Sequence, residues 1–291
     1  MHRTPSLLIL LFSAAWRAAD FSGASALEFT RQAVAFGPRP AGSPAMRRQQ
    51  QWILGELKPR KCQVIQDDFT AQTPHGAVPM KNIIARFPGS SGRIIVLTGH
   101  YDSKPMPGIQ FLGANDGGSS TGLLLEMARV LSGAPRQDEV DLVWFDGEEA
   151  FAQWSGADGI YGSRHLAERW RADGTLGRIR ALINVDMIGD RDLGILIDLN
   201  SSVTLRRLVW QTAADIGYRR HFLAETTAIE DDHMPFVRLG VNALDLIDYH
   251  YGPDNAYWHT DKDTVDKLSG ESLEAVGKVL LEVVRRLEVQ R

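Results

Sequence analysis

The hydrophobic pattern of the chain predicts strands that alternate with helices. Buried strands are expected in four short apolar runs, at residues 93–100, 141–145, 181–185 and 242–247. Helices are expected in four further segments, at residues 119–131, 163–170, 202–216 and 270–287. Because this alternation is typical of a parallel sheet covered on both faces, we expect an α/β fold. It should be a single-domain three-layer sandwich with a mostly parallel central sheet and helices on both faces.

The segment before this alternation has a different pattern. Residues 27–57 show helical spacing on both sides of a break at residues 37–40, where the sequence reads Gly-Pro-Arg-Pro. Residues 62–87 alternate apolar and polar positions around a turn near Pro74 and Gly76, which is typical of edge strands. Since no repeat or linker divides the chain, residues 26–291 are expected to form one domain.

The N-terminus has the order of a secretory signal. A basic start at Arg3 precedes an apolar run over residues 7–16, and small residues follow at Ala18 and Ala19. The run is shorter than the roughly 20 apolar residues that a membrane-spanning helix needs. We therefore expect residues 1–25 to be a signal peptide or an N-terminal anchor, and the protein to be exported, either periplasmic or secreted. A buried N-terminal helix is the alternative, because Arg17 interrupts the cleavage region.

Composition narrows the possible functions. The 291 residues are 44% hydrophobic and 23% charged, which supports a sizeable core and excludes a disordered chain. The net charge is −4 and there are no long runs of one sign, so the sequence lacks the basic pattern typical of nucleic-acid-binding proteins. The single cysteine, Cys62, allows neither an intrachain disulfide nor a cysteine-based zinc site. Any metal must therefore be bound by His, Asp and Glu.

Ionisable residues gather where the predicted strands end, which is where open α/β sheets bind ligands. These residues are His100, Asp116, Glu148, Glu149, Asp186, Asp231 and His259. Taken singly, each has an ordinary explanation as a solvated loop residue, a helix cap or a structural histidine. Together at one sheet edge they would repel one another without a cation or a hydrogen-bond network. Imidazole and carboxylate ligands suit zinc, whereas calcium and magnesium prefer oxygen ligands alone.

Several motifs resemble those of the zinc aminopeptidase superfamily. They are GHYDSK at residues 99–104, GANDGGSS at 113–120, FDGEEAFAQW at 145–154, YGSRHLA at 161–167, DDHMPF at 231–236 and YWHT at 257–260. Within the superfamily they look most like the glutaminyl-peptide cyclotransferases, the glutaminyl cyclases of the animal secretory type. Trp154, Asp231 and Trp258 carry the likeness to that branch.

The resemblance implies a zinc-dependent enzyme that converts N-terminal glutamine of peptides or proteins to pyroglutamate and releases ammonia. It implies one Zn²⁺ bound by Asp116, Glu149 and His259, with Glu148 as the base and acid that shuttles the proton. It further implies that Asp186 and Asp231 form a hydrogen-bond network beside Glu148, and that Trp154 and Trp258 bind the substrate. We expect a monomer with a zinc-aminopeptidase-like fold, without a stable membrane span.

Two alternatives stay open. A dinuclear zinc aminopeptidase would use His100 and Asp186 as additional ligands, with Asp116 bridging the metals. A non-catalytic peptide-binding module would keep the fold without the metal. The chain also departs from the animal pattern, because it cannot form the disulfide found there near the metal loop. The segment between Asp245 and Trp258 is longer and more polar than its animal counterpart.

Overall fold

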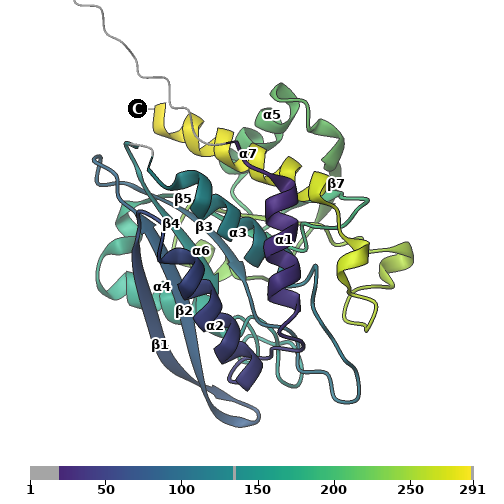
Figure 1. Ribbon diagram of the computed structural model, residues 1–291. Coiled ribbons are helices and arrows are strands. Elements are labelled where there is room, and N and C mark those ends of the chain that lie inside the picture. Colours follow the sequence, from purple (N-terminus) through teal and green to yellow (C-terminus); the bar gives the residue numbers. More distant parts are fainter. Residues whose placement is uncertain (1–19, 134–135, 290–291) are drawn as a thin grey trace, which may run out of the picture.

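The computed structural model describes residues 20–133 and 136–289 (Figure 1). Most of the expected N-terminal leader, residues 1–19, lies outside the described residues. Phe21 is already buried, and helix α1 (Gly23–Val34) packs against helix α7 (Gly270–Val289). In the described ranges, no helix combines the length and apolar character needed to cross a bilayer.

A six-stranded sheet forms the centre of the fold. Its spatial order is β1-β2-β4-β3-β5-β8. The strands are β1 (Gln63–Thr73), β2 (Gly76–Phe87), β3 (Ile94–His100), β4 (Glu139–Phe145), β5 (Ile179–Asp186) and β8 (Ala243–Ile247). Strands β4, β3, β5 and β8 run parallel to one another. Strand β2 runs antiparallel to both of its neighbours, β1 and β4. Strand β3 is fully buried from Ile94 to His100, as expected for a central strand with helices on both sides.

Helices cover both faces of the sheet (Figure 1). On one side, α1 packs on α3 (Gly118–Leu131) and α7, with α2 (Pro44–Leu57) and α5 (Val203–Asp215) beside them. On the other side, α4 (Tyr161–Ala172) contacts α6 (Met234–Arg238). Two large apolar clusters fill the spaces between these layers and the sheet. The predicted α/β three-layer sandwich is confirmed.

The structure also differs from the expected pattern in several elements. Strand β1 is an edge strand, but β2 is not, because it pairs with β4 as well as with β1. A separate two-stranded sheet, β6 (Ile195–Asp198) with β7 (Phe222–Thr227), was not predicted. Its strands are short, and only Phe222 of β7 is buried, so the hydrophobic pattern of β7 is weak. Short 3-10 helices also occur, at Thr175–Arg178, Arg219–His221, Pro253–Asn255 and Val265–Lys267.

Candidate active site

A pocket of about 620 Å³ opens at the carboxyl ends of the parallel strands. Strand β5 ends at Asp186, the loop after β4 carries Glu148 and Glu149, and the loop before α3 carries Asp116. The residues predicted for the site that line this pocket are Asp116, Glu148, Glu149, Trp154, Asp186, Asp231, Trp258 and His259. The fold thus brings together side chains that lie far apart in the sequence. They meet at the edge of the sheet where the parallel strands end, which is the position predicted from the sequence.

Asp116, Glu149 and His259 converge on one point. Their ligand atoms all lie within 4.8 Å of one another, and His259 Nε2 is 3.3 Å from Asp116 Oδ2 and 3.2 Å from Glu149 Oε1. Both carboxylate oxygens are buried and have no hydrogen-bond partner among the described residues. When His259 Nε2 carries no proton, these three lone pairs repel one another unless a cation lies between them. The donor set, two carboxylates and an imidazole, fits Zn²⁺ with one open position.

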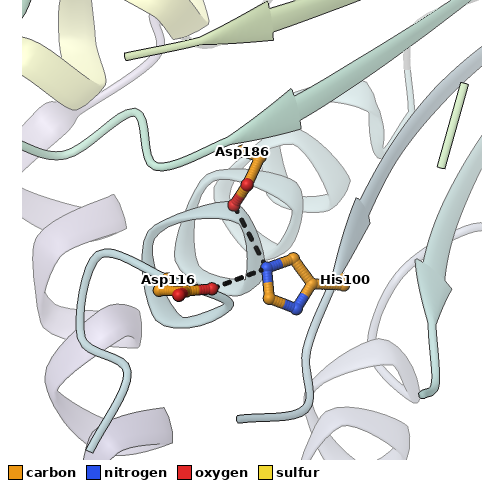
Figure 2. Close-up of side chains that lie close together, drawn as sticks. All are labelled: His100, Asp116 and Asp186. Carbon is orange, nitrogen blue, oxygen red and sulfur yellow. Dashed lines mark hydrogen bonds and ion pairs between the residues drawn. The ribbon is translucent and has the colours of Figure 1, made fainter. Parts of the chain in front are cut away.

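His100 forms a second cluster with Asp116 and Asp186 (Figure 2). Its Nε2 lies 3.1 Å from Asp116 Oδ1 and 3.1 Å from Asp186 Oδ1. Burial lowers the pKa of His100, but the carboxylates, with Asp186 first, raise it well above its ordinary value. Burial also raises the pKa of Asp186 to about 7, with His100 opposing. Because Asp116 contacts both His100 and His259, it is the residue that joins the two clusters.

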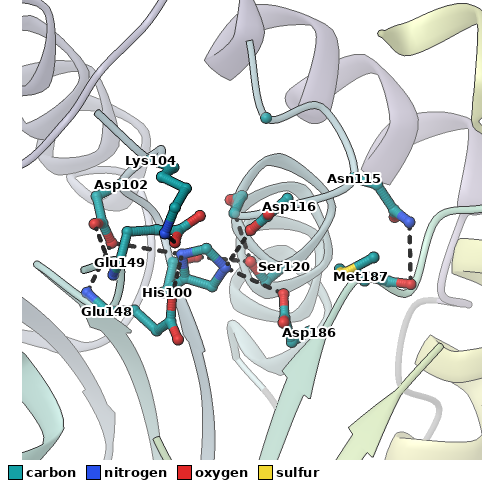
Figure 3. A network of polar contacts seen from close by, with 12 residues as sticks. His100, Asp102, Lys104, Asn115, Asp116, Ser120, Glu148, Glu149, Asp186 and Met187 are labelled. Atoms are coloured by element: carbon teal, nitrogen blue, oxygen red, sulfur yellow. Dashed lines mark hydrogen bonds and ion pairs between the residues drawn. The ribbon is translucent and has the colours of Figure 1, made fainter. Parts of the chain in front are cut away.

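Glu148 lies next to these clusters, and Asp102 holds its backbone in place (Figure 3). The Asp102 carboxylate accepts the backbone N–H groups of Glu148, at 3.1 Å, and of Glu149, at 3.3 Å. Glu148 Oε2 is 3.9 Å from His100 Nδ1. Burial raises the pKa of Glu148 well above its ordinary value, although His100 opposes this. A carboxyl group with a raised pKa at the edge of a metal cluster is suited to accept and return a proton.

Further buried carboxyl groups extend from the pocket into the protein. The Asn184 side-chain amide donates to Asp231 Oδ2, at 3.0 Å, and to Asp245 Oδ1, at 3.1 Å. Thr98 Oγ1 in turn donates to Asn184 Oδ1 at 2.8 Å, which fixes the orientation of the amide. Burial raises the pKa of Asp231, and it raises that of Asp245 well above its ordinary value. Asp186 and Asp231 line the same pocket as Glu148, and the Asn184 amide connects Asp231 to Asp245.

Aromatic rings form part of the pocket wall. The ring of Trp258 stacks on His259, with 4.1 Å between centroids and 23° between planes, and Tyr249 lies 5.1 Å from Trp258. Trp154 is 40% exposed, so it stands at the mouth of the pocket. His259 itself has a φ of 51°, in the left-handed region that residues other than glycine rarely adopt. Packing against Trp258 and the Asp116 and Glu149 contacts keep this conformation in place.

Two buried side chains hold the loop that carries Asp116. The Arg39 guanidinium donates to the carbonyls of Leu112 and Gly113, the latter at 2.8 Å. From the other end, the Asp263 carboxylate accepts the backbone N–H groups of Asn115, at 2.8 Å, and of Asp116, at 3.2 Å. These bonds fix the backbone of Asp116 and therefore the direction in which its carboxylate points.

Several residues that shape the site have no role predicted from the sequence. Asp102 and Asp263 bind backbone N–H groups of the residues that surround the cluster, and Lys104 Nζ is 3.1 Å from Glu149 Oε2. Tyr249 lines the pocket beside Trp258. Asp102 and Lys104 follow directly after the strand that ends at His100, so their position was a usable signal. Nothing in the local sequence marks Asp263 as a partner of Asn115, which lies 148 positions away.

Known proteins are similar to this chain over most of its length. Residues 82–284 match peptidase family M28. The chain is 32% identical over 252 residues to a glutaminyl-peptide cyclotransferase of Drosophila melanogaster, an alignment that covers 78% of this chain and 70% of the relative. The bovine glutaminyl-peptide cyclotransferase is 30% identical over 279 residues, covering 83% and 76% of the two chains.

A solved structure is similar over the whole length. The crystal structure of an Acidobacteriales bacterium glutaminyl cyclase covers 100% of both chains, with 40% identity and a TM-score of 0.91. A Zn-dependent exopeptidase from Parabacteroides distasonis matches 92% of this chain and 99% of its own, at 27% identity and a TM-score of 0.81. The chain belongs to peptidase family M28 and, within it, to the family of the glutaminyl-peptide cyclotransferases.

Proposed function

We propose that this chain is a zinc-dependent glutaminyl-peptide cyclotransferase, which converts N-terminal glutamine of peptides and proteins to pyroglutamate. The observation that carries the proposal is the pocket in which Asp116, Glu149 and His259 face one point with Glu148 beside them. The similar proteins named glutaminyl-peptide cyclotransferase or glutaminyl cyclase support it, since they span most of the chain.

In the proposed reaction, the α-amine of the N-terminal glutamine attacks the carbonyl carbon of its own side-chain amide. A carbon–nitrogen bond forms, the bond to the amide nitrogen breaks, ammonia leaves, and a five-membered lactam remains. Both reacting groups belong to one residue, so their proximity is partly built in. Asp116, Glu149 and His259 would hold the Zn²⁺, whose bound form supplies Lewis-acid polarisation of the amide carbonyl.

Glu148 is the residue that we propose to move the proton. Its carboxylate would accept a proton from the α-ammonium group and return it to the departing nitrogen. Its raised pKa follows from burial. Asp102 keeps Glu148 and Glu149 in fixed relative positions through their backbone N–H groups. Asp186 and Asp231 would contribute the polar network around the α-amine.

The aromatic residues would enclose the glutamine side chain. Trp258 is packed on His259 and therefore borders the metal cluster, while Trp154 stands at the pocket mouth. Apolar walls exclude water, which strengthens the electrostatic interactions of the groups inside the pocket. We propose both tryptophans as substrate-binding residues.

Incubation of the purified protein with a Gln-initiated peptide and with a matched Leu-initiated peptide tests the proposed function. We expect the first peptide to become lighter by the mass of one ammonia and the second to stay unchanged. Release of free leucine from the second peptide, with no cyclisation of the first, would contradict the proposal. Mass spectrometry distinguishes these products directly.

A dinuclear aminopeptidase is the second candidate, because His100, Asp116 and Asp186 form a further group that can bind a metal. A similar structure is named a Zn-dependent exopeptidase, and another a leucine aminopeptidase precursor, at 26% identity and a TM-score of 0.83. Metal analysis separates the candidates, since one zinc per chain is expected for the cyclotransferase and two for the aminopeptidase.

We also propose that the N-terminal segment directs export, because its basic start and apolar run have the order of a secretory signal. N-terminal sequencing of the mature protein tests this, and we expect the sequence to begin after the apolar run. An intact Met1 on a protein recovered from inside the cell would contradict it.

A further inference from the structure

A second hollow adjoins the active-site pocket. It has a volume of about 590 Å³ and lies between the end of the β1–β2 hairpin and the loop that follows Glu149. Its walls include Gln72, Thr73, Pro74, Ser155, Ala157 and Asp158. We call it the hairpin pocket. Ala152, Gln153 and Trp154 line both hollows, so the two adjoin along this segment.

The loop wall of the hairpin pocket is fixed by Asp158. Its carboxylate accepts the backbone N–H groups of Phe151 and Ala152, at 2.8 Å each, and of Gln153, at 3.0 Å. It also accepts the Tyr161 hydroxyl at 2.9 Å. These bonds satisfy the charge of Asp158 within the protein and order the segment that precedes Trp154. A ligand therefore meets a preformed wall and loses little affinity to the ordering of this loop.

The hairpin wall is fixed as well. Thr73 Oγ1 donates to the Gly76 carbonyl at 2.9 Å and accepts the His75 N–H group at 3.1 Å, which closes the turn. The His75 ring packs edge-on against Phe151 with 5.8 Å between centroids. This contact joins the hairpin to the loop, so both walls keep their positions relative to Trp154.

The chemistry of the hairpin pocket favours an uncharged, extended peptide. Its lining offers amides, hydroxyl groups and apolar surface, and its one ionisable residue, Asp158, is already saturated with donors. Gln72 and Thr73 end β1, the edge strand, so one side of that backbone faces no other strand of the six-stranded sheet. Free main-chain groups along an edge strand can hydrogen-bond an extended peptide.

We infer that the hairpin pocket binds the residues that follow the N-terminal glutamine of the substrate. This inference rests on the proposed function, in which the first residue occupies the active-site pocket. The remaining peptide must cross the rim, and Trp154, 40% exposed, provides a surface that leads from one hollow to the other. The substrates are then peptides or extended protein N-termini of several residues. Small uncharged side chains after the glutamine suit the lining, because its one ionisable residue, Asp158, is already hydrogen-bonded within the protein and offers a charged side chain no free ionic partner.

The test compares glutamine amide, which has no residue after the glutamine, with a Gln-initiated hexapeptide amide of uncharged residues. Ala157→Trp fills the hairpin pocket from an exposed position whose side chain makes no hydrogen bond. Ala172→Trp, at the exposed end of α4 and outside both hollows, is the matched control. We expect Ala157→Trp to lower kcat/KM for the hexapeptide by about tenfold, mainly through KM, and to leave kcat/KM for glutamine amide within about twofold. The control should change neither.

A second variant and a binding measurement complete the test. Gln72→Trp fills the hollow from the opposite wall and should reproduce the effect. Calorimetric titration with the pyroglutamyl hexapeptide, the reaction product, should show weaker binding to Ala157→Trp than to the unaltered protein. Equal kcat/KM for both substrates in the unaltered protein, or equal losses for both in the variants, would overturn the inference. Failure to cyclise either substrate would instead overturn the proposed function.

Discussion

Removal of the Asp263 carboxylate tests whether the Asp116 loop is positioned as described. Asp263→Ala leaves three buried donors without an acceptor: the N–H groups of Asn115 and Asp116 and the Tyr251 hydroxyl, which donates at 2.7 Å. Each unsatisfied donor costs about 1–3 kcal/mol. Burial, and next Asp116, raise the pKa of Asp263 to about 7, so the charged form is itself unfavourable and its loss offsets part of the cost. We expect the free energy of unfolding to fall by about 3 kcal/mol.

The zinc affinity of Asp263→Ala should fall as well, because the backbone N–H group of Asp116 loses its hydrogen bond to Asp263. Substitution of a residue that orients a metal ligand typically lowers the metal affinity by about 10- to 100-fold. Urea denaturation of the metal-free protein measures the first effect, and competition with a chromophoric chelator measures the second. Tyr251→Phe is the control, since it removes one donor to Asp263 and leaves both backbone bonds. Unchanged zinc affinity in Asp263→Ala, or an equal loss in Tyr251→Phe, would refute the reasoning.

Three further changes address the proposed reaction. Glu148→Gln should keep zinc bound and lower turnover by about 10²- to 10⁴-fold, because the proton carrier is lost; near-normal ammonia release would reject its role. Glu149→Ala should lose the metal, as one of three ligands is removed, so stoichiometric zinc in a metal analysis would reject that ligand. Trp154→Ala should raise KM for Gln-initiated peptides with a smaller effect on kcat, and steady-state kinetics with unchanged KM would contradict its placement at the pocket mouth.

The fold was predictable where burial dictates the pattern. Strand β3 and helix α3 have continuous or helically spaced apolar residues, and both occur within one residue of the expected bounds. The weakly patterned elements were missed, since β7 has one buried residue and α6 has only five residues. For β2, alternation along one strand does not reveal the neighbour on its second side, so the pairing with β4 could not be predicted.

The position of the site was predictable for a different reason. Residues such as Asp186 come directly after a strand, and parallel strands end at one edge of the sheet. Asp263 and Arg39 act through backbone groups of a distant loop, and no spacing rule connects them to Asp116. The orientation of His100 toward both Asp116 and Asp186 likewise depends on three separate segments, so a sequence alone yields the residue types but not the contacts.

Arg39 and Asp263 hold residues 112–116 from both ends. The nature of these contacts determines the conditions in which the pocket keeps its shape. These contacts are hydrogen bonds, and Cys62, the only cysteine in the sequence, is a free thiol. No covalent bridge within the chain can be opened by a thiol reductant. The arrangement of the loop should thus be the same in glutathione-rich and in oxidising surroundings.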